Sequence, residues 1–459
     1  MAGMQTWEVE IAAQVCVDVP FRPRNPERRE FMVHDATYEQ RLMRAQSFDA
    51  GDELAVFRDE FHLPRQENGE PILYFVGNSL GLQPKRTESY IAEELTKWRE
   101  LGVRGHFECE RPWMPYHEFL SETMAELVGA QANEVVMMNS LTTNLHLMLA
   151  TFYRPTQTRH KILIEDHAFP SDFQAASSQV VWNGFDPAHS LLVLPTEETT
   201  AAINEEAIIE TIHREGSQLA LVMLPGVQYY TGQVFPMERI VAAAHAVGAK
   251  VGFDLAHAAG NIRMHLHDWD VDFAVWCSYK YLNSGPGSVG GCFVHERHAR
   301  NVDLPRLAGW WGHDKGTRFK MKNEFKAIPT AEGWQLSNPP ILSLAAIRAS
   351  LDVFKEAGGM SPLIGKSTLL TQYLDVQLRN RLGDRIKVLT PESGRGCQLS
   401  LEIDCGEMPG KQVHRHLEAS GVETDWREPN VIRVAPVPLY NSFEDCFHFV
   451  EKLANCMKA

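Results

Sequence analysis

Two kinds of hydrophobic pattern alternate between residues 133 and 296. Short continuous apolar runs are followed by longer stretches in which apolar residues recur every three or four positions. The first pattern is typical of strands buried on both faces, and the second is typical of the helices that cover them. We expect strands at EVVMMN, KILIED, LLVLP, LALVML, KVGFD and DFAVWC, and helices at LTTNLHLMLATF, FPSDFQAASSQVV and ERIVAAAHAVGAK. The alternation predicts an α/β fold with a mainly parallel sheet.

The pattern changes on both sides of this region. Upstream, the spacing of Ile91, Leu95 and Trp98 predicts an amphipathic helix, whereas the first 45 or so residues are polar and irregular. Downstream, the Gly- and Trp-rich segments AGWWGHD and NPPILS predict loops that line a site.

A helix over 344–357 is expected to lead into a second domain, in which CQLSLEID and VIRVAP are strands and KQVHRHLEAS and the C-terminal segment are helices. This order indicates a compact α+β unit. The predicted organisation is an extension at 1–45, a large domain at 46–345 and a small C-terminal domain at 346–459.

Composition narrows the class of protein. The chain has 459 residues, of which 44% are hydrophobic and 22% charged, as in ordinary globular enzymes. A net charge of -15 disfavours non-specific nucleic-acid binding. The eight cysteines form no C-x-x-C pair, and the N-terminal segment lacks the basic and apolar regions of a secretory signal. The longest apolar runs are too short to span a bilayer. We therefore expect a reduced, cytoplasmic enzyme without metal.

Lys280 is the most informative residue. It follows the apolar stretch from Val271 to Cys277 and precedes a loop rich in glycine. A charged lysine at the mouth of a buried strand is costly, so burial favours the neutral, nucleophilic amine. The competing interpretation is a lysine whose stem follows the strand and whose ammonium reaches water. Lys280 is our candidate for the covalent link to an aldehyde cofactor and for the catalytic base.

Asp254 and His257 end the strand that precedes the Lys280 strand. A carboxylate at Asp254 could keep a pyridine nitrogen protonated, and His257 could contact the same ring. Tyr279, next to Lys280, is a candidate phosphate donor or catalytic acid. Each residue also has a structural interpretation, namely a helix cap for Asp254, a core histidine for His257 and aromatic packing for Tyr279.

A phosphate fits best where EVVMMN turns into the next predicted helix. There the backbone N–H groups of Leu141 and Thr142, with the Thr142 hydroxyl, would lie at the positive end of the helix. On its own, NSLTTN is better explained as an ordinary helix N-cap. Arg433, a cation inside the apolar VIRVAP run, suits a substrate carboxylate or an internal ion pair. The order of phosphate turn, D-x-x-H and Y-K before a glycine loop favours pyridoxal phosphate.

A family resemblance rests on ordered motifs from about Phe57 to the C-terminus. They include YFVGNSLGLQPK, RPWMPYHE, FPSD, GVQYYTGQ, VGFDLAHAAGN, WCSYKYLN, GWWGH, SNPPIL and IRVAPVPLYNSF. With these motifs the chain resembles kynureninase of the eukaryotic type, a fold-type-I pyridoxal-phosphate hydrolase. The resemblance implies cleavage of L-kynurenine or 3-hydroxy-L-kynurenine to L-alanine and anthranilate or 3-hydroxyanthranilate. It also implies a cytoplasmic homodimer in tryptophan catabolism and pyridine nucleotide biosynthesis.

The resemblance also implies roles for individual residues. Lys280 and Tyr279 are the expected catalytic residues, and His106, Asn338 and Arg433 are expected to bind substrate, with His106 and Asn338 tied to 3-hydroxykynurenine preference. Trp310 and Asn338 match positions that the partner subunit supplies in family dimers. The expected cofactor contacts are Leu141, Thr142, Phe169, Asp172, Asp254, His257, Tyr279, Lys280, Trp310 and Asn338.

One position departs from the family, and three alternatives compete with it. Pro225 stands where some relatives carry a serine that contacts the cofactor. A cysteine desulfurase would need a mobile cysteine, for which Cys397 is the candidate. A zinc enzyme built on His265 and His267 lacks a third spaced ligand in the sequence. A binding protein that has lost catalysis would not be expected to keep Lys280 and its partners.

Overall fold

The computed structural model describes residues 31, 37–404, 406 and 409–457. Its large domain is built on a seven-stranded sheet in which β8 runs antiparallel to both of its neighbours, while the remaining neighbours are parallel. The expected mainly parallel sheet is confirmed. Its strands in spatial order are β2 (Val135–Met137), β8 (Gly291–Val294), β7 (Phe273–Trp276), β6 (Lys250–Asp254), β5 (Leu219–Pro225), β3 (Lys161–Glu165) and β4 (Leu191–Leu194).

Successive strand residues enter two different cores, one on each face of the sheet. Val135 and Met137 pack into one core, whereas Val136 packs into the other. Helices α5 (Leu141–Phe152) and α6 (Pro170–Trp182) cover the second face. The first face is covered by α4 (Glu118–Val128), α8 (Glu205–Glu215), α9 (Met237–Ala246) and α11 (Ile341–Glu356). Burial on both faces explains why these strands are apolar throughout.

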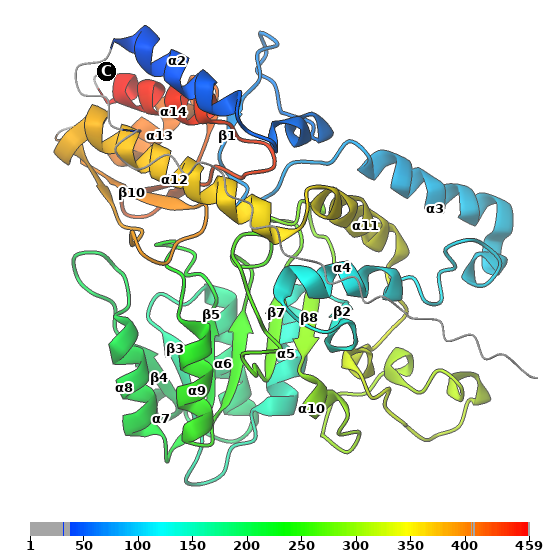
Figure 1. The fold of residues 1–459 in the computed structure, drawn as a ribbon. Helices are drawn as coiled ribbons and strands as arrows, with labels where there is room; N and C mark the ends of the chain where they lie inside the picture. Colours follow the sequence, from blue (N-terminus) through cyan, green and yellow to red (C-terminus); the bar gives the residue numbers. More distant parts are fainter. Residues whose placement is uncertain (1–30, 32–36, 405, 407–408, 458–459) are drawn as a thin grey trace, which may run out of the picture.

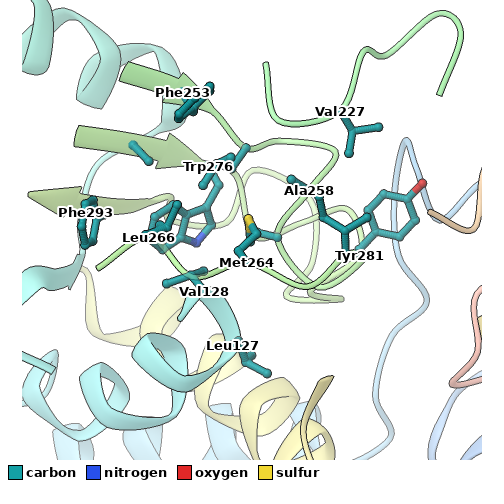
Figure 2. Packing of buried hydrophobic residues seen from close by; sticks show 14 of the residues in the cluster. Leu127, Val128, Val227, Phe253, Ala258, Met264, Leu266, Trp276, Tyr281 and Phe293 are labelled. Atoms are coloured by element: carbon teal, nitrogen blue, oxygen red, sulfur yellow. The ribbon is translucent and has the colours of Figure 1, made fainter. Parts of the chain in front are cut away.

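Aromatic side chains from three neighbouring strands anchor the first core. Phe253, Trp276 and Phe293 project from β6, β7 and β8 toward Leu266 and the end of α4 (Figure 2). All are buried, and each contributes about 1.5–3 kcal/mol by leaving water. The packing fixes where β6 and β7 end and therefore where the residues that follow them lie.

The small domain contains a four-stranded antiparallel sheet at one end of the molecule (Figure 1). Its strands in spatial order are β12 (Asp425–Arg427), β13 (Val431–Val434), β10 (Leu399–Ile403) and β9 (Ile386–Val388). Helices α12 (Met360–Leu382), α13 (Gly410–Ala419) and α14 (Phe443–Cys456) belong to the same end. The expected α+β unit is present, although the short strands β9 and β12 were not predicted.

The segment before residue 46 corrects the sequence prediction. Residues 38–45 are not irregular, because they lie in α2 (Tyr38–Asp49), which begins with a capping box from Thr37 to Gln40. This helix packs on α14, and Arg41 forms a 2.7 Å ion pair with Glu451. The rest of the predicted extension, at 1–30 and 32–36, lies outside the described residues. The described part of the extension therefore belongs to the small domain.

The remaining elements lie within the large domain or link it to the small domain. The helix expected near residues 88–101 is α3 (Thr87–Leu101), and it packs against α11. β1 (Leu73–Tyr74) pairs in parallel with β11 (Val422–Glu423), so the start of the chain reaches the small domain. Two short helices are α7 (Pro187–Ser190) and α10 (Glu296–Ala299). Among the described helices, none combines the length and apolarity needed to cross a membrane.

Candidate active site

A cavity of about 390 Å³ opens at the carboxyl ends of the central strands. This is the edge at which open parallel sheets bind ligands. β3, β5 and β6 end at the cavity, the loop after β7 forms one wall, and Arg433 of β13 reaches it from the small domain. Nine of the predicted site residues line it, namely Leu141, Thr142, Phe169, Asp172, Asp254, His257, Tyr279, Lys280 and Arg433.

The side chains of Lys280 and His257 contact each other in the cavity lining. Lys280 Nζ lies 2.9 Å from His257 Nε2 and 5.9 Å from the centre of the Phe169 ring. Burial, followed by the positive charge of Lys280, holds the pKa of His257 well below its usual value. The imidazole is therefore neutral, and its Nε2 accepts a hydrogen bond from the lysine. His257 Nδ1 is buried and has no hydrogen-bond partner among the described residues.

The loop that carries Lys280 is held by close backbone contacts. Gly81 N–H donates a 2.8 Å hydrogen bond to the Tyr279 carbonyl. A Cβ at Gly81 would lie 2.3 Å from the Lys280 carbonyl oxygen, which no side chain tolerates. The segment GNSLG, which the resemblance highlighted, therefore positions the lysine loop from behind.

Asp254 and Asp172 form a buried carboxyl pair. Both residues are buried, and burial raises both pKa values. The hydrogen bond between them raises the pKa of Asp172 and lowers that of Asp254, while Ala256 N–H donates to Asp254 Oδ1 at 2.7 Å. Burial therefore favours a proton on this pair, and the Ala256 amide and the charge of Lys280 act against protonation at Asp254.

The N-terminus of α5 forms another wall. Ser140 is the N-cap residue, but its side chain makes no capping hydrogen bond. The amide groups at Leu141 and Thr142 are therefore left for a ligand, as the turn predicted. A Cβ at Gly290 would lie 3.1 Å from the Leu141 nitrogen and 2.7 Å from the Trp276 carbonyl oxygen. Gly290 thus lets the glycine loop approach the α5 N-terminus closely.

Arg433 is both an ion-pair partner and a cavity residue. Its Nη2 lies 2.6 Å from Asp425 Oδ2, and its Nη1 donates to the Tyr229 carbonyl at 2.6 Å. The internal ion pair considered from the sequence is therefore present, although it leaves the guanidinium at the cavity wall. Arg427 binds the same carboxylate with Nε at 2.8 Å. Two cations share one acid, so this wall keeps a net positive charge.

Three predicted residues lie away from this cavity within one chain. His106 ends the short helix at Gly102–His106 and contacts the edge of Trp113. Trp310 is 41% exposed and lines a separate surface hollow beside Phe325. Asn338 is exposed in the loop before α11. Their expected roles at the site stay predictions, since for Trp310 and Asn338 they depend on a second subunit.

Several cavity residues carried no individual prediction. Ser79 and Tyr229 belong to motifs of the family resemblance but have no predicted role, and Glu165 is predicted only as part of a strand. The signal for Glu165 was its position at the end of a buried strand, where parallel sheets place functional groups. The unassigned cavity residues with polar side chains are Asn78, Ser79, Glu165, Ser171, Tyr229 and Arg427.

The structure bears on the two alternative chemistries, a cysteine desulfurase and a zinc enzyme, in different ways. Cys397 is buried, and burial raises the pKa of its thiol to about 12, which does not suit a mobile sulfur acceptor. His267 groups with Glu134 and His295 but not with His265, so the described residues do not bring the predicted pair together with a third ligand. The His267 and His295 rings are stacked with an interplanar angle of 14°. Parallel rings cannot both point in-plane at one ion, so the group is a hydrogen-bonded cluster.

Comparisons with known proteins point to one family. A family described as "Kynureninase C-terminal domain" matches residues 363–453. The chain is 54% identical to a protein named kynureninase from Koribacter versatilis, over 88% of this chain and 95% of that one. It is 53% identical to the kynureninase of Myxococcus xanthus, over 89% and 96%. A solved structure of the cystine C–S lyase C-DES has a TM-score of 0.71 at 18% identity, over 84% and 97%, which supports the fold.

Proposed function

The chain belongs to the kynureninase family, and from this premise we propose that it hydrolyses the Cβ–Cγ bond of L-kynurenine, of 3-hydroxy-L-kynurenine, or of both. The products are L-alanine and anthranilate or 3-hydroxyanthranilate. One water molecule supplies the oxygen and hydrogen atoms that the two products gain when the bond breaks. Family membership makes the chain a kynurenine-cleaving hydrolase that depends on pyridoxal phosphate. The choice of aryl ring and the place in tryptophan catabolism and pyridine nucleotide biosynthesis are part of the proposal.

The main support for the proposal is that four different chemical groups line one cavity. Lys280 offers an amine, Asp254 a buried carboxylate, the α5 N-terminus free amides and Arg433 a guanidinium. They come from four separate parts of the fold. A structural role for any one of them would not explain why all four face the same space.

The residues present fit pyridoxal phosphate. The uncapped N-terminus of α5 suits a phosphate, and the Asp254 carboxyl group in a buried wall suits a protonated ring nitrogen. His257 Nδ1 is a buried polar atom without a described partner, as expected of a group that contacts a polar ligand. Pro225 lines the same cavity without a hydroxyl, so the contact made by a serine in some relatives is lost there. The other predicted cofactor residues do not depend on it.

When bound, pyridoxal phosphate supplies an aldehyde for amines and a ring that takes up electrons from the carbon beside the amine. Lys280 would hold the aldehyde and, once displaced by the substrate amine, remove the proton from Cα. Its hydrogen bond to neutral His257 orients the amine in the cavity. Asp254 would hold the proton on the ring nitrogen, and Phe169 would lie against the ring.

The remaining steps need a carboxylate site and a proton donor. Arg433 would bind the substrate α-carboxylate, because the shared Asp425 leaves positive charge at this wall. Burial, followed by the neighbouring Cys277, raises the pKa of Tyr279, so the phenol keeps its proton at neutral pH. Tyr279 would donate it as the Cβ–Cγ bond breaks and the aryl acid leaves.

We further propose a cytoplasmic homodimer that completes the site. Exposed aromatic side chains gather around Trp310, among them Phe319 at 5.7 Å between ring centres. Such a surface is typical of an interface. A second copy could bring Trp310 and Asn338 to the cavity, as the resemblance implies.

The direct test is product formation by the purified enzyme with added pyridoxal phosphate. We expect anthranilate from kynurenine in the wild type and at least about a 10³-fold lower rate in Lys280→Ala, because both the covalent link and the base are lost. A matched control is Lys315→Ala, which removes an exposed lysine that pairs with Glu118 and Glu332. Equal loss in both variants would contradict the role of Lys280.

Substrate choice is tested with both substrates in His106→Ala and Asn338→Ala. We expect kcat/KM for 3-hydroxykynurenine to fall relative to that for kynurenine by about tenfold, the value of one buried polar contact. An unchanged ratio in both variants would overturn the assignment of these residues to ring selection, without affecting the hydrolysis itself.

A further inference from the structure

Arg427 is a second cation in the cavity wall, and the proposed reaction does not yet use it. It ends β12 and lines the same cavity as Lys280 and Arg433. Asp425 already forms a two-point ion pair with Arg433, in which Nη2 lies 2.6 Å from Oδ2 and Nε lies 3.3 Å from Oδ1. The single charge of Asp425 therefore cannot also neutralise Arg427.

Arg433 has few hydrogen-bond donors left for a substrate. A guanidinium group has five N–H donors. In Arg433, the Nε–H and one Nη2–H donate to Asp425. The other Nη2–H donates to Ser79 Oγ at 3.3 Å, and one Nη1–H donates to the Tyr229 carbonyl at 2.6 Å. One Nη1–H remains, so Arg433 by itself cannot bind both oxygens of a carboxylate.

The missing donor can come from Arg427 but not from Ser79. The Ser79 hydroxyl group donates its only proton to Asp425 Oδ2 and accepts from Arg433. Arg427 Nη2 donates to Asp425 Oδ2 at 3.1 Å, and its Nε lies 2.8 Å from Oδ1. Arg427 Nη1 makes no hydrogen bond to any described residue, so both of its N–H groups are available to a ligand.

The two guanidinium groups lie close to each other and act on the same cavity. Both pair with the Asp425 carboxylate, and their Cζ atoms lie 5.7 Å (Arg427) and 6.0 Å (Arg433) from the centre of the Tyr229 ring. Burial, followed by the charge of Lys280, is the main cause of the low pKa of His257. The charges of the two arginines lower this pKa further, so both reach the cavity interior.

We propose that Arg427 is a second ligand of the substrate α-carboxylate, with Arg433 bound to one oxygen and Arg427 Nη1 bound to the other. Two guanidinium groups then hold one carboxylate through charge-assisted hydrogen bonds and fix the direction of the amino acid in the cavity. Asp425 keeps both guanidinium groups in place. This site rests on the proposed function in one respect, namely that the substrate is an α-amino acid.

The site is tested by the binding of two amines to the holoenzyme, followed by the visible absorbance of pyridoxal phosphate. L-Alanine is the proposed product, and ethylamine is the same molecule without its carboxylate. In Arg427→Gln, the Kd for L-alanine should rise at least about tenfold, as expected for one lost charge-assisted hydrogen bond, while that for ethylamine should stay within about twofold. Arg239→Gln, which removes an exposed arginine paired with Glu206, is the control and should change neither Kd.

Two results would overturn the proposal. One is an unchanged Kd for L-alanine in Arg427→Gln, and the other is an equal rise for both amines, which would indicate a general change of the cavity. Wild-type enzyme that binds L-alanine but does not cleave kynurenine would contradict the proposed function alone and leave the carboxylate site standing. Failure of the wild type to bind L-alanine would contradict both.

Discussion

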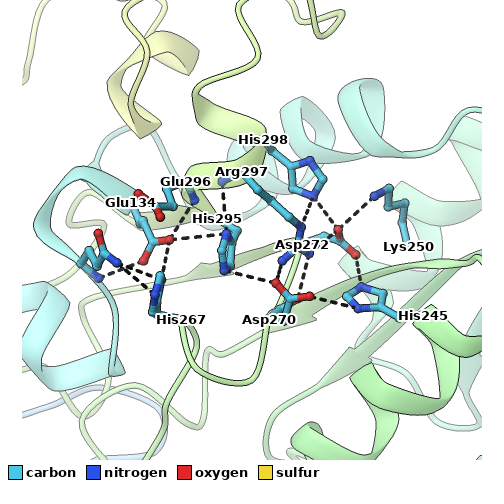
Figure 3. A network of polar contacts seen from close by, with 11 residues as sticks. Glu134, His245, Lys250, His267, Asp270, Asp272, His295, Glu296, Arg297 and His298 are labelled. Atoms are coloured by element: carbon cyan, nitrogen blue, oxygen red, sulfur yellow. Dashed lines mark hydrogen bonds and ion pairs between the residues drawn. The ribbon is translucent and has the colours of Figure 1, made fainter.

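The two edges of the central sheet both carry buried charged groups, yet only one has the properties of an active site. The carboxyl edge holds the cavity with Lys280 and the buried carboxyl groups. The amino edge holds a network centred on Asp272, just before β7, and on Glu134, just before β2 (Figure 3). Both regions are rich in histidine and acid, so composition does not separate them.

At the amino edge, every buried acid is satisfied. Asp272 receives hydrogen bonds from His245 at 2.9 Å, His298 at 2.6 Å and Arg297 at 2.8 Å, and from a backbone amide at 2.8 Å. Burial acts to raise the pKa of Asp272, but the hydrogen bonds from His245 and His298, together with nearby positive charge, outweigh it and hold the pKa well below its usual value. This carboxylate is stabilised where it lies.

At the carboxyl edge, burial has a larger effect on the pKa values of the acids than hydrogen bonding has. Burial dominates at Asp254 and Asp172, so both pKa values are raised, and polar atoms of His257 and Asp172 lack hydrogen-bond partners within the part of the chain that the structure describes. This comparison indicates that a cluster of buried charges is a functional site when some of its polar atoms lack hydrogen-bond partners among the described residues and the cluster borders a cavity. A complete network is a structural element.

The largest expected effect comes from breaking the complete network. Asp272→Asn leaves Lys250, Arg297 and two histidines without their shared acid, and the free energy of unfolding should fall by about 3–5 kcal/mol. Urea unfolding of the apoenzyme measures it. Asp268→Asn is the control, because its side chain is 76% exposed. A loss below about 1 kcal/mol would show that the network does not stabilise the fold.

The corresponding change at the carboxyl edge should act on function instead. In Asp254→Asn we expect kcat to fall about 10²–10³-fold, because the ring nitrogen loses its anionic partner. The free energy of unfolding of the apoenzyme should not fall, since the buried charge that is removed was unfavourable. Kinetics and urea unfolding on one preparation measure both. A variant that is unstable but catalytically normal would reverse the distinction between the two edges.

A smaller effect concerns pH. The pKa of Glu165 is raised to about 8 in the folded protein, from 4.5 when unfolded. The folded state therefore holds a proton that the unfolded state releases, and this contribution to stability is complete below pH 4.5 and is lost as the pH rises through about 8. Relative to Glu165→Gln, the wild-type apoenzyme should lose up to about 1.4 kcal/mol per pH unit in this range. Parallel pH profiles of unfolding would contradict the raised pKa.

The sequence predicted the chemistry of the carboxyl edge better than that of the amino edge. Lys280, Asp254 and His257 follow apolar strands directly, so strand periodicity alone places them at one edge. Ser79, Arg427 and Glu165 could not be assigned in this way, because their meeting depends on how the small domain and β3 pack against the loop after β7. The Asp272 network was not predicted either, since its members come from separate elements and have no common spacing.

The prediction of helices and strands was limited in the same way. Long helices such as α3 and α5 were predicted almost to the residue from their periodicity. β8 was missed because Gly290 and Gly291 precede only a few apolar residues, and glycine ordinarily signals a loop. α2 was missed because its sequence is largely polar, and it is held in place by packing on α14.

The most direct test of the central claim is to locate the cofactor on the chain. Holoenzyme is reduced with borohydride, digested and analysed by mass spectrometry. We predict a phosphopyridoxyl group on Lys280 in the wild type, together with visible absorbance before reduction, and neither in Lys280→Ala. A modified lysine elsewhere, or unmodified protein after incubation with pyridoxal phosphate, would contradict the assignment of the carboxyl edge as the active site.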